Sequence, residues 1–262
     1  MTPTGSGKAP PAPAVPYGRE ASQVANLHLP AGEGPFPVVV LLHGGFWRAG
    51  WDRTLMTPLA RDLAERGVAA WNVEYRRVGE AGGGWPGTFL DVAAAVDHLP
   101  SIEALDLERV VACGHSAGGH LALWLAARTR LPAGAPGAAP KVRVRAAVAQ
   151  AAVADLRGGW ESGFGREQMS ALLGGGPADV PERYRAADPT SLAPFGLPQL
   201  LVHGALDDVV PLEQSRSFAR ATGSDAELVE FADADHFDVI DPRHPAWLAV
   251  VERLPDLLRA DV

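Results

Sequence analysis

The chain has 262 residues, 47% of them hydrophobic, so it can bury a core within one domain without a disulfide or a metal to hold it together. Its formal charge of −8, from 31 acidic and 23 basic residues, argues against nucleic acid or an anionic membrane surface as a partner, because both are negatively charged. The single cysteine excludes an internal disulfide framework.

Residues 1–21 are rich in proline, alanine and glycine, and this composition predicts a flexible arm. The arm contains no apolar run of the roughly 7–15 residues that a secretory signal needs. No later stretch approaches the roughly 18 apolar residues of a membrane span. We therefore expect a cytoplasmic protein without a membrane partner, with one domain over residues 22–262.

Short apolar runs alternate with helical patterns along that domain. Buried strands are predicted at residues 36–42, 68–73, 109–113, 145–150, 199–203 and 227–231, and residues 23–29 alternate like an edge strand. Helices are predicted at residues 54–66, 88–99, 117–128, 212–221 and 246–259. Buried strands separated by helices indicate an α/β fold with a mostly parallel sheet flanked by helices on both faces.

The segment 155–198 interrupts this alternation, because it is long, irregular and glycine-rich. A connection of that length in a compact domain commonly covers an active site. We interpret it as a short lid insertion rather than a second domain.

A Gly-x-Ser-x-Gly motif occupies residues 114–118 (GHSAG). An apolar strand leads into it and an alanine- and leucine-rich helical stretch follows, which is the setting that a nucleophilic serine requires. Gly114 and Gly118 leave room at a sharp turn that would point the Ser116 hydroxyl into open space. We predict that Ser116 is a nucleophile; the alternative is a glycine-rich turn whose serine caps the helix.

The sequence HGGFW at residues 43–47 follows a predicted central strand. Adjacent glycines let the backbone approach a substrate, where preorganised N–H groups stabilise the negative charge on a reacting carbonyl oxygen. We predict an oxyanion hole from the N–H groups of Gly45, Phe46 and Ala117. We expect His43 to be structural and place Trp47 at the substrate, with core packing as the alternative for Trp47.

A strand ending in two carboxylates lies in residues 201–211 (LVHGALDDVVP). Asp207 and Asp208 compete for the role of orienting a histidine, and we favour Asp207 because the turn after it runs Asp-x-x-Val-Pro. His236, just past the last predicted strand, has an imidazole that can take the serine proton near neutral pH. A triad of Ser116, Asp207 and His236 is therefore predicted.

We expect no cofactor, because the remaining polar residues form no pattern typical of a cofactor site. No cluster of His, Cys and Asp has metal-ligand spacing, so no metal site is expected. Cys113 fits a small buried side chain. His115 and His120 flank the serine and are candidates to line the pocket, and we place His115 at the substrate. The loop aromatics could also line it: Trp51, Trp85, Trp160 and Phe164.

Four motifs in this order, HGGFW, GHSAGGH, HGALDDVVP and DHFDVI, resemble the α/β-hydrolase superfamily from about residue 22 to near the end of the chain. Within it, HGGFW and DHFDVI are most similar to the kynurenine formamidase (arylformamidase) group. HGALDDVVP is also similar to prolyl-oligopeptidase-like hydrolases and to small acetyl or feruloyl esterases. The resemblance implies the same triad and the same oxyanion donors.

The expected function is hydrolysis of a small-molecule carboxylic ester or amide through an acyl-enzyme, with N-formylkynurenine or another aryl formamide as the most specific substrate. The alternatives are a general short-chain carboxylesterase, a peptidase and a non-catalytic binding protein on the same fold. We expect a monomer or a homodimer.

Overall fold

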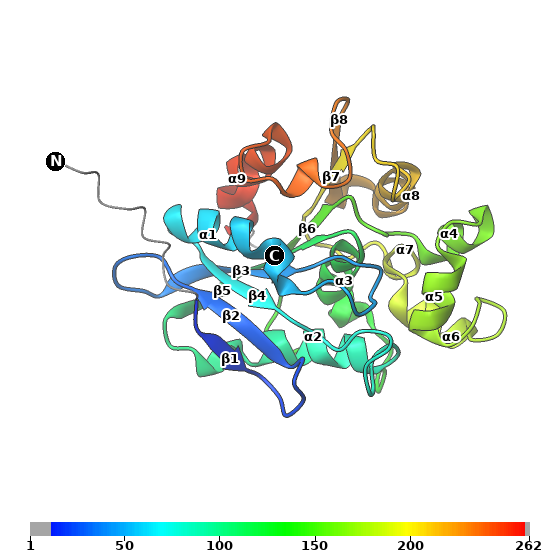
Figure 1. Cartoon of the computed structure of the whole chain (residues 1–262), viewed down its shortest axis with the longest axis horizontal. Coiled ribbons are helices and arrows are strands. Elements are labelled where there is room, and N and C mark those ends of the chain that lie inside the picture. The colour runs from blue at the N-terminus through cyan, green and yellow to red at the C-terminus, as the bar shows by residue number, and fades with distance from the viewer. Residues whose placement is uncertain (1–11, 260–262) are drawn as a thin grey trace.

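The structure is a computed structural model that describes residues 12–259, and it is built around one eight-stranded sheet (Figure 1). The strand order is β1-β2-β4-β3-β5-β6-β7-β8. The pairings β1–β2 and β2–β4 are antiparallel, and every pairing from β4–β3 to β7–β8 is parallel. The bounds are Ala14–Pro16 (β1), Val24–His28 (β2), Phe36–Leu42 (β3), Ala69–Val73 (β4), Leu105–His115 (β5), Ala146–Gln150 (β6), Gln199–Gly204 (β7) and Ala226–Phe231 (β8).

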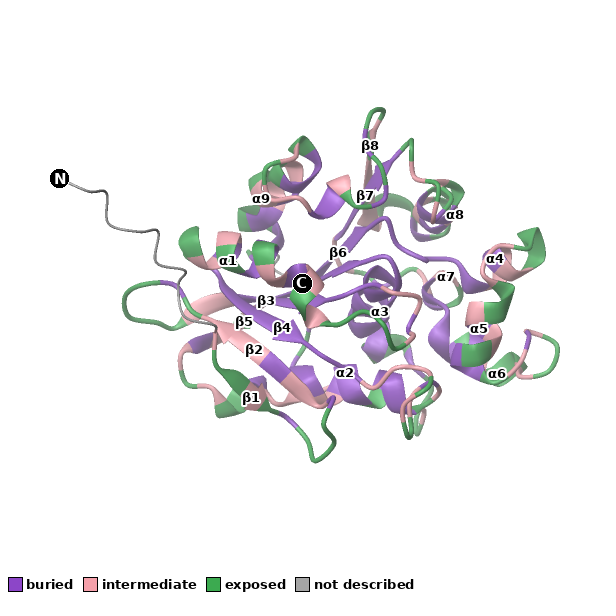
Figure 2. Cartoon of the chain, viewed as in Figure 1, coloured by how far each residue is buried: buried purple, intermediate pink, exposed green. Residues whose placement is uncertain are grey.

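The central strands are buried on both faces, as their continuous apolar runs predict (Figure 2). In β3 the side chains of Val38 and Val40 join one core cluster and those of Val39 and Leu41 join the other, because successive side chains of a strand point to opposite faces. The expected parallel sheet with two covered faces is confirmed.

Helices cover both faces. One core contains side chains from Thr57–Glu65 (α1) and Pro245–Leu257 (α9), and the other contains side chains from Gly87–Asp97 (α2), Ala117–Ala126 (α3) and Glu213–Thr222 (α8). Short 3₁₀ helices lie at Arg53–Met56 (η1), Leu99–Ser101 (η2), Ala127–Arg130 (η3), Gly223–Asp225 (η4) and Asp238–Ile240 (η5). Three of the helices predicted from periodicity therefore begin or end in a 3₁₀ turn rather than as one continuous α-helix.

The N-terminal segment differs from the prediction of a flexible arm over residues 1–21. Residues 1–11 lie outside the described part of the chain, but Ala14–Pro16 forms β1 and pairs with β2. Proline suits this position, because a strand that pairs on only one side does not need every backbone N–H. The prediction that residues 23–29 form an edge strand is also wrong. Because β1 pairs with β2, β2 lies between β1 and β4 and β1 is the edge.

The segment 155–198 is helical, with Leu156–Ser162 (α4), Arg166–Leu173 (α5), Pro181–Ala187 (α6) and Pro189–Leu192 (α7). Figure 1 places α4, α5 and α6 together at one end of the molecule, beyond α3 and α7. The insertion contacts the HGGFW loop, since Arg48 pairs with Glu167 and the rings of Phe46 and Phe164 lie 6.2 Å apart. Its role as a lid stays a prediction.

Across residues 12–259, the structure contains no helix with the length and apolarity that crossing a bilayer demands. The expected cytoplasmic location stays a prediction.

Trp247 of α9 is fully buried and its Nε1 donates to Asp62 Oδ2 of α1 at 2.7 Å, so it ties two helices to one face of the sheet. We expect Trp247→Ala to lower the free energy of unfolding by about 3–5 kcal/mol, because it leaves a cavity and removes the hydrogen bond to Asp62, whose carboxylate keeps only Arg66 as a partner. Leu248→Ala is the matched control, since this neighbour is 43% exposed; it should cost about 0.5 kcal/mol or less. Urea unfolding followed by circular dichroism measures both, and equal losses would contradict the packing described.

Candidate active site

Ser116 lies at the turn between β5 and α3 with a backbone conformation that L-residues rarely adopt, φ 56° and ψ −119°. The flanking glycines make this turn possible. A Cβ on Gly114 would collide with the Gly118 carbonyl, and a Cβ on Gly118 would collide with the carbonyls of Leu42 and His43. The turn is held by a hydrogen bond from Ser116 N–H to Gln150 O at 2.8 Å. These contacts supply the strained elbow that the motif predicts.

The HGGFW loop follows β3 and runs beside this turn. Gly45, Phe46 and Trp47 have φ values of 112°, 50° and 58°, so three successive residues take left-handed or related conformations. The loop approaches the serine closely, because a Cβ on Gly44 would lie 3.0 Å from the Ser116 Cβ.

The predicted oxyanion donors have no acceptor in the described part of the chain. Among the described residues, the N–H groups of Gly45 and Phe46 have no hydrogen-bond acceptor. Ala117 is the first residue of α3, where an N–H has no acceptor within the helix. Three donors therefore remain available near the serine, which is the arrangement that oxyanion stabilisation requires.

The structure distinguishes the two carboxylates. Asp207 Oδ2 lies 2.7 Å from His236 Nδ1, and Asp207 Oδ1 accepts hydrogen bonds from the N–H groups of Val209 and Val210 at 2.9 and 2.8 Å. Its side chain is buried, whereas Asp208 is exposed. The geometry thus favours Asp207 as the partner of the histidine, as the turn sequence predicts.

A second histidine contacts the same carboxylate. His203, at the end of β7, is fully buried and its Nε2 lies 3.2 Å from Asp207 Oδ2. Burial by itself would raise the pKa of Asp207, but the hydrogen bonds from His203 and His236 outweigh it and hold the pKa below its ordinary value. His203 was not among the predicted site residues. The spacing His-x-x-x-Asp at the end of a strand is the signal that would have identified it.

His236 and Ser116 line the same pocket, of about 240 Å³, at the carboxyl ends of the parallel strands. Within the described residues no hydrogen bond joins Ser116 Oγ to the imidazole, and such contacts commonly tighten only when substrate binds. The other lining residues, mostly apolar, are Gly45, Phe46, Trp51, Leu55, His115, Val209 and Phe237.

Trp47 corrects one prediction. It is 1% exposed and packs edge-on against His120 with ring centroids 5.1 Å apart, so it belongs to the core and not to the pocket wall. Of the other loop aromatics considered, Trp51 lines the pocket and Trp85, Trp160 and Phe164 do not. Leu55, Val209 and Phe237 were not predicted; Phe237 could have been found from its place directly after His236.

His115 lines the pocket and is almost fully buried, and its predicted contact with the substrate stays a prediction. Its Nε2 is 2.8 Å from the backbone oxygen of His236, so it donates there and leaves Nδ1 as an acceptor without a partner among the described residues. Burial, together with the nearby His236 ring, lowers the pKa of His115 to about 3. His115 therefore stays neutral and supports the loop that carries His236.

His120 and His43 are structural. His120 Nε2 donates a hydrogen bond to Ala187 O at 2.9 Å, and burial lowers the pKa of His120 to about 4. His43 stacks on Tyr75 with ring centroids 4.4 Å apart and its Nε2 lies 2.9 Å from Glu74 Oε1. This buried pair fixes the base of the HGGFW loop.

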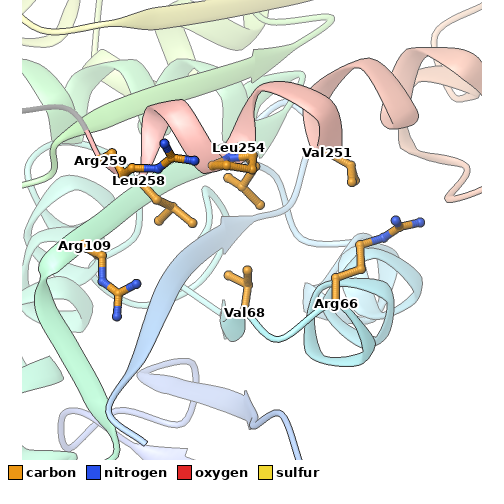
Figure 3. Close-up of a pocket in the computed structure, with 8 residues that line it drawn as sticks. Arg66, Val68, Arg109, Val251, Leu254, Leu258 and Arg259 are labelled. Carbon is orange, nitrogen blue, oxygen red and sulfur yellow. The ribbon is translucent and has the colours of Figure 1, made fainter.

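A cavity of about 360 Å³ lies at the opposite end of the parallel strands (Figure 3). Three arginines surround an apolar floor, and Arg66 and Arg109 pair with Asp62 and Asp106. Its lining contains no nucleophile or acid–base pair, so the catalytic candidates gather at the carboxyl ends of the strands.

Within residues 12–259, no group of three or more His, Cys, Asp or Glu is arranged to hold a metal ion. Burial raises the pKa of Cys113 to about 12, which keeps this thiol protonated.

A mostly parallel sheet, a serine on the turn after β5, and an acid and a histidine after β7 and β8 define the α/β-hydrolase fold. The chain belongs, more narrowly, to the BD-FAE family, whose model matches residues 26–222. It is similar to esterase LipQ of Mycobacterium tuberculosis, with 29% identity over 75% of this chain and 48% of LipQ. It is also similar to the probable carboxylic ester hydrolase LipM of the same organism, with 30% identity over 71% of this chain and 44% of LipM. The chain thus spans about half the length of these relatives.

Solved structures show the same fold. A truncated carbohydrate esterase from gut microbiota aligns with a TM-score of 0.81 at 19% identity, over 94% of this chain and 95% of that one. The thermophilic esterase Est2 of Thermogutta terrifontis aligns with a TM-score of 0.75 at 25% identity, over 95% of this chain and 92% of Est2. Est2 has also been solved with propionate and with butyrate bound.

The contacts of the two carboxylates predict different effects of removing their charge. We expect Asp207→Asn to lower kcat by about 10⁴-fold, since the amide cannot stabilise the imidazolium or fix its tautomer. Asp208→Asn is the matched control and should remain close to the wild-type rate, because its side chain is exposed. Ester hydrolysis at neutral pH measures both, and a larger loss in Asp208→Asn would move the acid to that residue.

The buried neutral histidines predict how stability depends on pH. The pKa of His120 is about 4 in the folded state and about 6.5 when unfolded, so the unfolded state binds the extra proton between these values. The contribution of His120 to stability is therefore fully present above pH 6.5 and falls as the pH drops toward 4. His120→Gln should reduce the slope of unfolding free energy against pH by up to about 1.4 kcal/mol per unit in this window. Urea unfolding from pH 4 to pH 8 tests this, and an unchanged slope in the variant would refute it.

Proposed function

We propose that the chain is a serine hydrolase that cleaves small carboxylic esters through an acyl-enzyme. One observation carries the proposal: Ser116 and the Asp207–His236 pair meet in a single pocket beside the free N–H groups of Gly45 and Phe46. This combination provides a nucleophile, a base, a group that orients the base, and donors for the developing oxyanion.

In the first step Ser116 Oγ attacks the substrate carbonyl carbon and His236 Nε2 accepts the hydroxyl proton. The hydrogen bond from Nδ1 to Asp207 leaves Nε2 as the acceptor. Asp207 remains ionised through this step, because its pKa lies below the ordinary value. The negative charge of Asp207 thus stabilises the positively charged imidazolium of His236 while the ring holds the serine proton.

The carbonyl oxygen then carries the negative charge of the tetrahedral intermediate. The N–H groups of Gly45, Phe46 and Ala117 are placed to stabilise it, and one such donor typically contributes about 2.7–4 kcal/mol to lowering the barrier. His236 returns its proton to the leaving oxygen as the C–O bond breaks. Water activated by the same imidazole releases the acid from Ser116 and restores the enzyme.

The pocket favours a small substrate with an apolar surface. Its volume of about 240 Å³ is at the lower end of the range for small-molecule sites. The propionate and butyrate bound to Est2 support short acyl groups for this chain as well. We therefore propose short-chain esters as the principal substrates.

A second candidate is hydrolysis of an aryl formamide such as N-formylkynurenine. The motifs HGGFW and DHFDVI support it, and so do the exposed rings of Trp51 and Phe237 at the pocket, which suit an aromatic amine. The formyl group is the smallest acyl group, so it fits the same oxyanion geometry. Parallel assays on N-formylkynurenine, p-nitrophenyl acetate and p-nitrophenyl butyrate separate the two candidates by their kcat/KM values.

Ser116→Ala tests the proposed function directly. We expect hydrolysis of p-nitrophenyl acetate to fall by at least about 10⁴-fold while the unfolding transition stays in place, because the hydroxyl serves chemistry and not packing. A fluorophosphonate should label wild-type Ser116 and should not label the variant. Hydrolysis at the wild-type rate by Ser116→Ala would exclude the mechanism, and an unlabelled wild-type Ser116 would favour a binding protein.

A further inference from the structure

Two large aromatic side chains stay exposed at the mouth of the pocket. Trp51 is 46% exposed and Phe237 is 43% exposed, and their rings stack with centroids 5.8 Å apart and an interplanar angle of 27°. Both line the pocket that holds Ser116 and His236. They come from the two ends of the domain, since Trp51 follows the oxyanion loop and Phe237 follows the histidine.

Each ring is held in place by the catalytic machinery. Trp51 packs on the oxyanion loop, where a Cβ on Gly45 would lie 2.7 Å from the Trp51 Cβ, and its backbone oxygen accepts a hydrogen bond from Arg77. Phe237 lies edge-on to His236 with centroids 5.2 Å apart, and its N–H donates to Asp235 Oδ1 at 2.7 Å. The two rings are therefore preorganised as one apolar surface with an open face.

The chemistry decides which half of a substrate meets this surface. His236 Nδ1 is engaged by Asp207, so Nε2 must deliver the proton to the leaving oxygen. The leaving group is consequently next to the imidazole when the bond breaks. Phe237 is directly beside that imidazole, and Trp51 extends the same surface outward.

We propose that Trp51 and Phe237 form a subsite for the leaving group that selects planar aromatic alcohols or amines over saturated ones. The proposal rests on the proposed hydrolase function. A flat ring can stack on the exposed face of this pair at little entropic cost, whereas a puckered ring of the same size cannot. Stacking of this kind corresponds to about a three- to tenfold preference in kcat/KM.

The test compares benzyl acetate with cyclohexylmethyl acetate. Both release the same acetyl group and a primary alcohol with a six-membered ring of carbon atoms, so flatness of the leaving group is the main difference. The wild type should favour benzyl acetate by about three- to tenfold in kcat/KM. Phe237→Leu and Trp51→Leu should each bring the ratio toward one, mainly through a higher KM for benzyl acetate.

Matched variants separate stacking from general damage. Phe237→Tyr keeps a flat ring and should keep the preference, and Leu90→Ala removes an equally exposed apolar side chain of α2 that lies outside the pocket and should leave the ratio unchanged. A wild-type ratio near one, or a preference that survives both leucine variants, overturns the subsite. So does a wild type labelled at Ser116 that hydrolyses neither ester. Absence of fluorophosphonate labelling at Ser116 instead refutes the hydrolase itself, so the two failures can be distinguished.

Discussion

The backbone of Ser116 is the constraint on which the candidate site depends. A non-glycine residue with positive φ is strained, and the strain persists only because its surroundings leave no alternative. Gly114 and Gly118 allow the carbonyls of β3 and α3 to approach without a side chain between them. The close approach brings the HGGFW loop against the serine, so the same packing that strains Ser116 also brings Gly45 and Phe46 into the same pocket.

Around this turn, burial separates the histidines and carboxylates into different roles. His115 and His120 are buried without a carboxylate partner, so their pKa values fall and they serve as neutral supports. Asp207 is buried as well, but two histidines and two backbone N–H groups keep it charged. Desolvation acts on all three, and hydrogen bonding decides which remains ionised. The site thus concentrates one negative charge where the proposed mechanism forms an imidazolium.

The sequence predicted a feature of the structure correctly where the feature depends on neighbouring residues, and less well where it depends on residues far apart along the chain. The strand at residues 36–42 was predicted to the residue, because a run of apolar side chains buried on both faces needs only local pattern to be recognised. The helix boundaries were less accurate, since short 3₁₀ turns at their ends depend on packing. β1 was missed because its three residues gain their backbone partners only from β2, which lies ten residues further along the chain. Trp47 was misplaced for a similar reason: only the backbone turn of its loop determines whether the ring faces substrate or core.

The order of the motifs and the choice of residue types were enough to identify the fold and to predict a serine nucleophile, its histidine and a hydrolase chemistry, because glycines at a strand–helix turn and a carboxylate at a strand end form local sequence patterns. The sequence alone does not show which side chains come into contact when they are distant along the chain. The contact of His203 with Asp207, the support of His236 by His115, and the stacking of Trp51 on Phe237 arise when parallel strands bring their carboxyl ends together. These contacts depend on distances set by the whole sheet, and the folded arrangement alone specifies them.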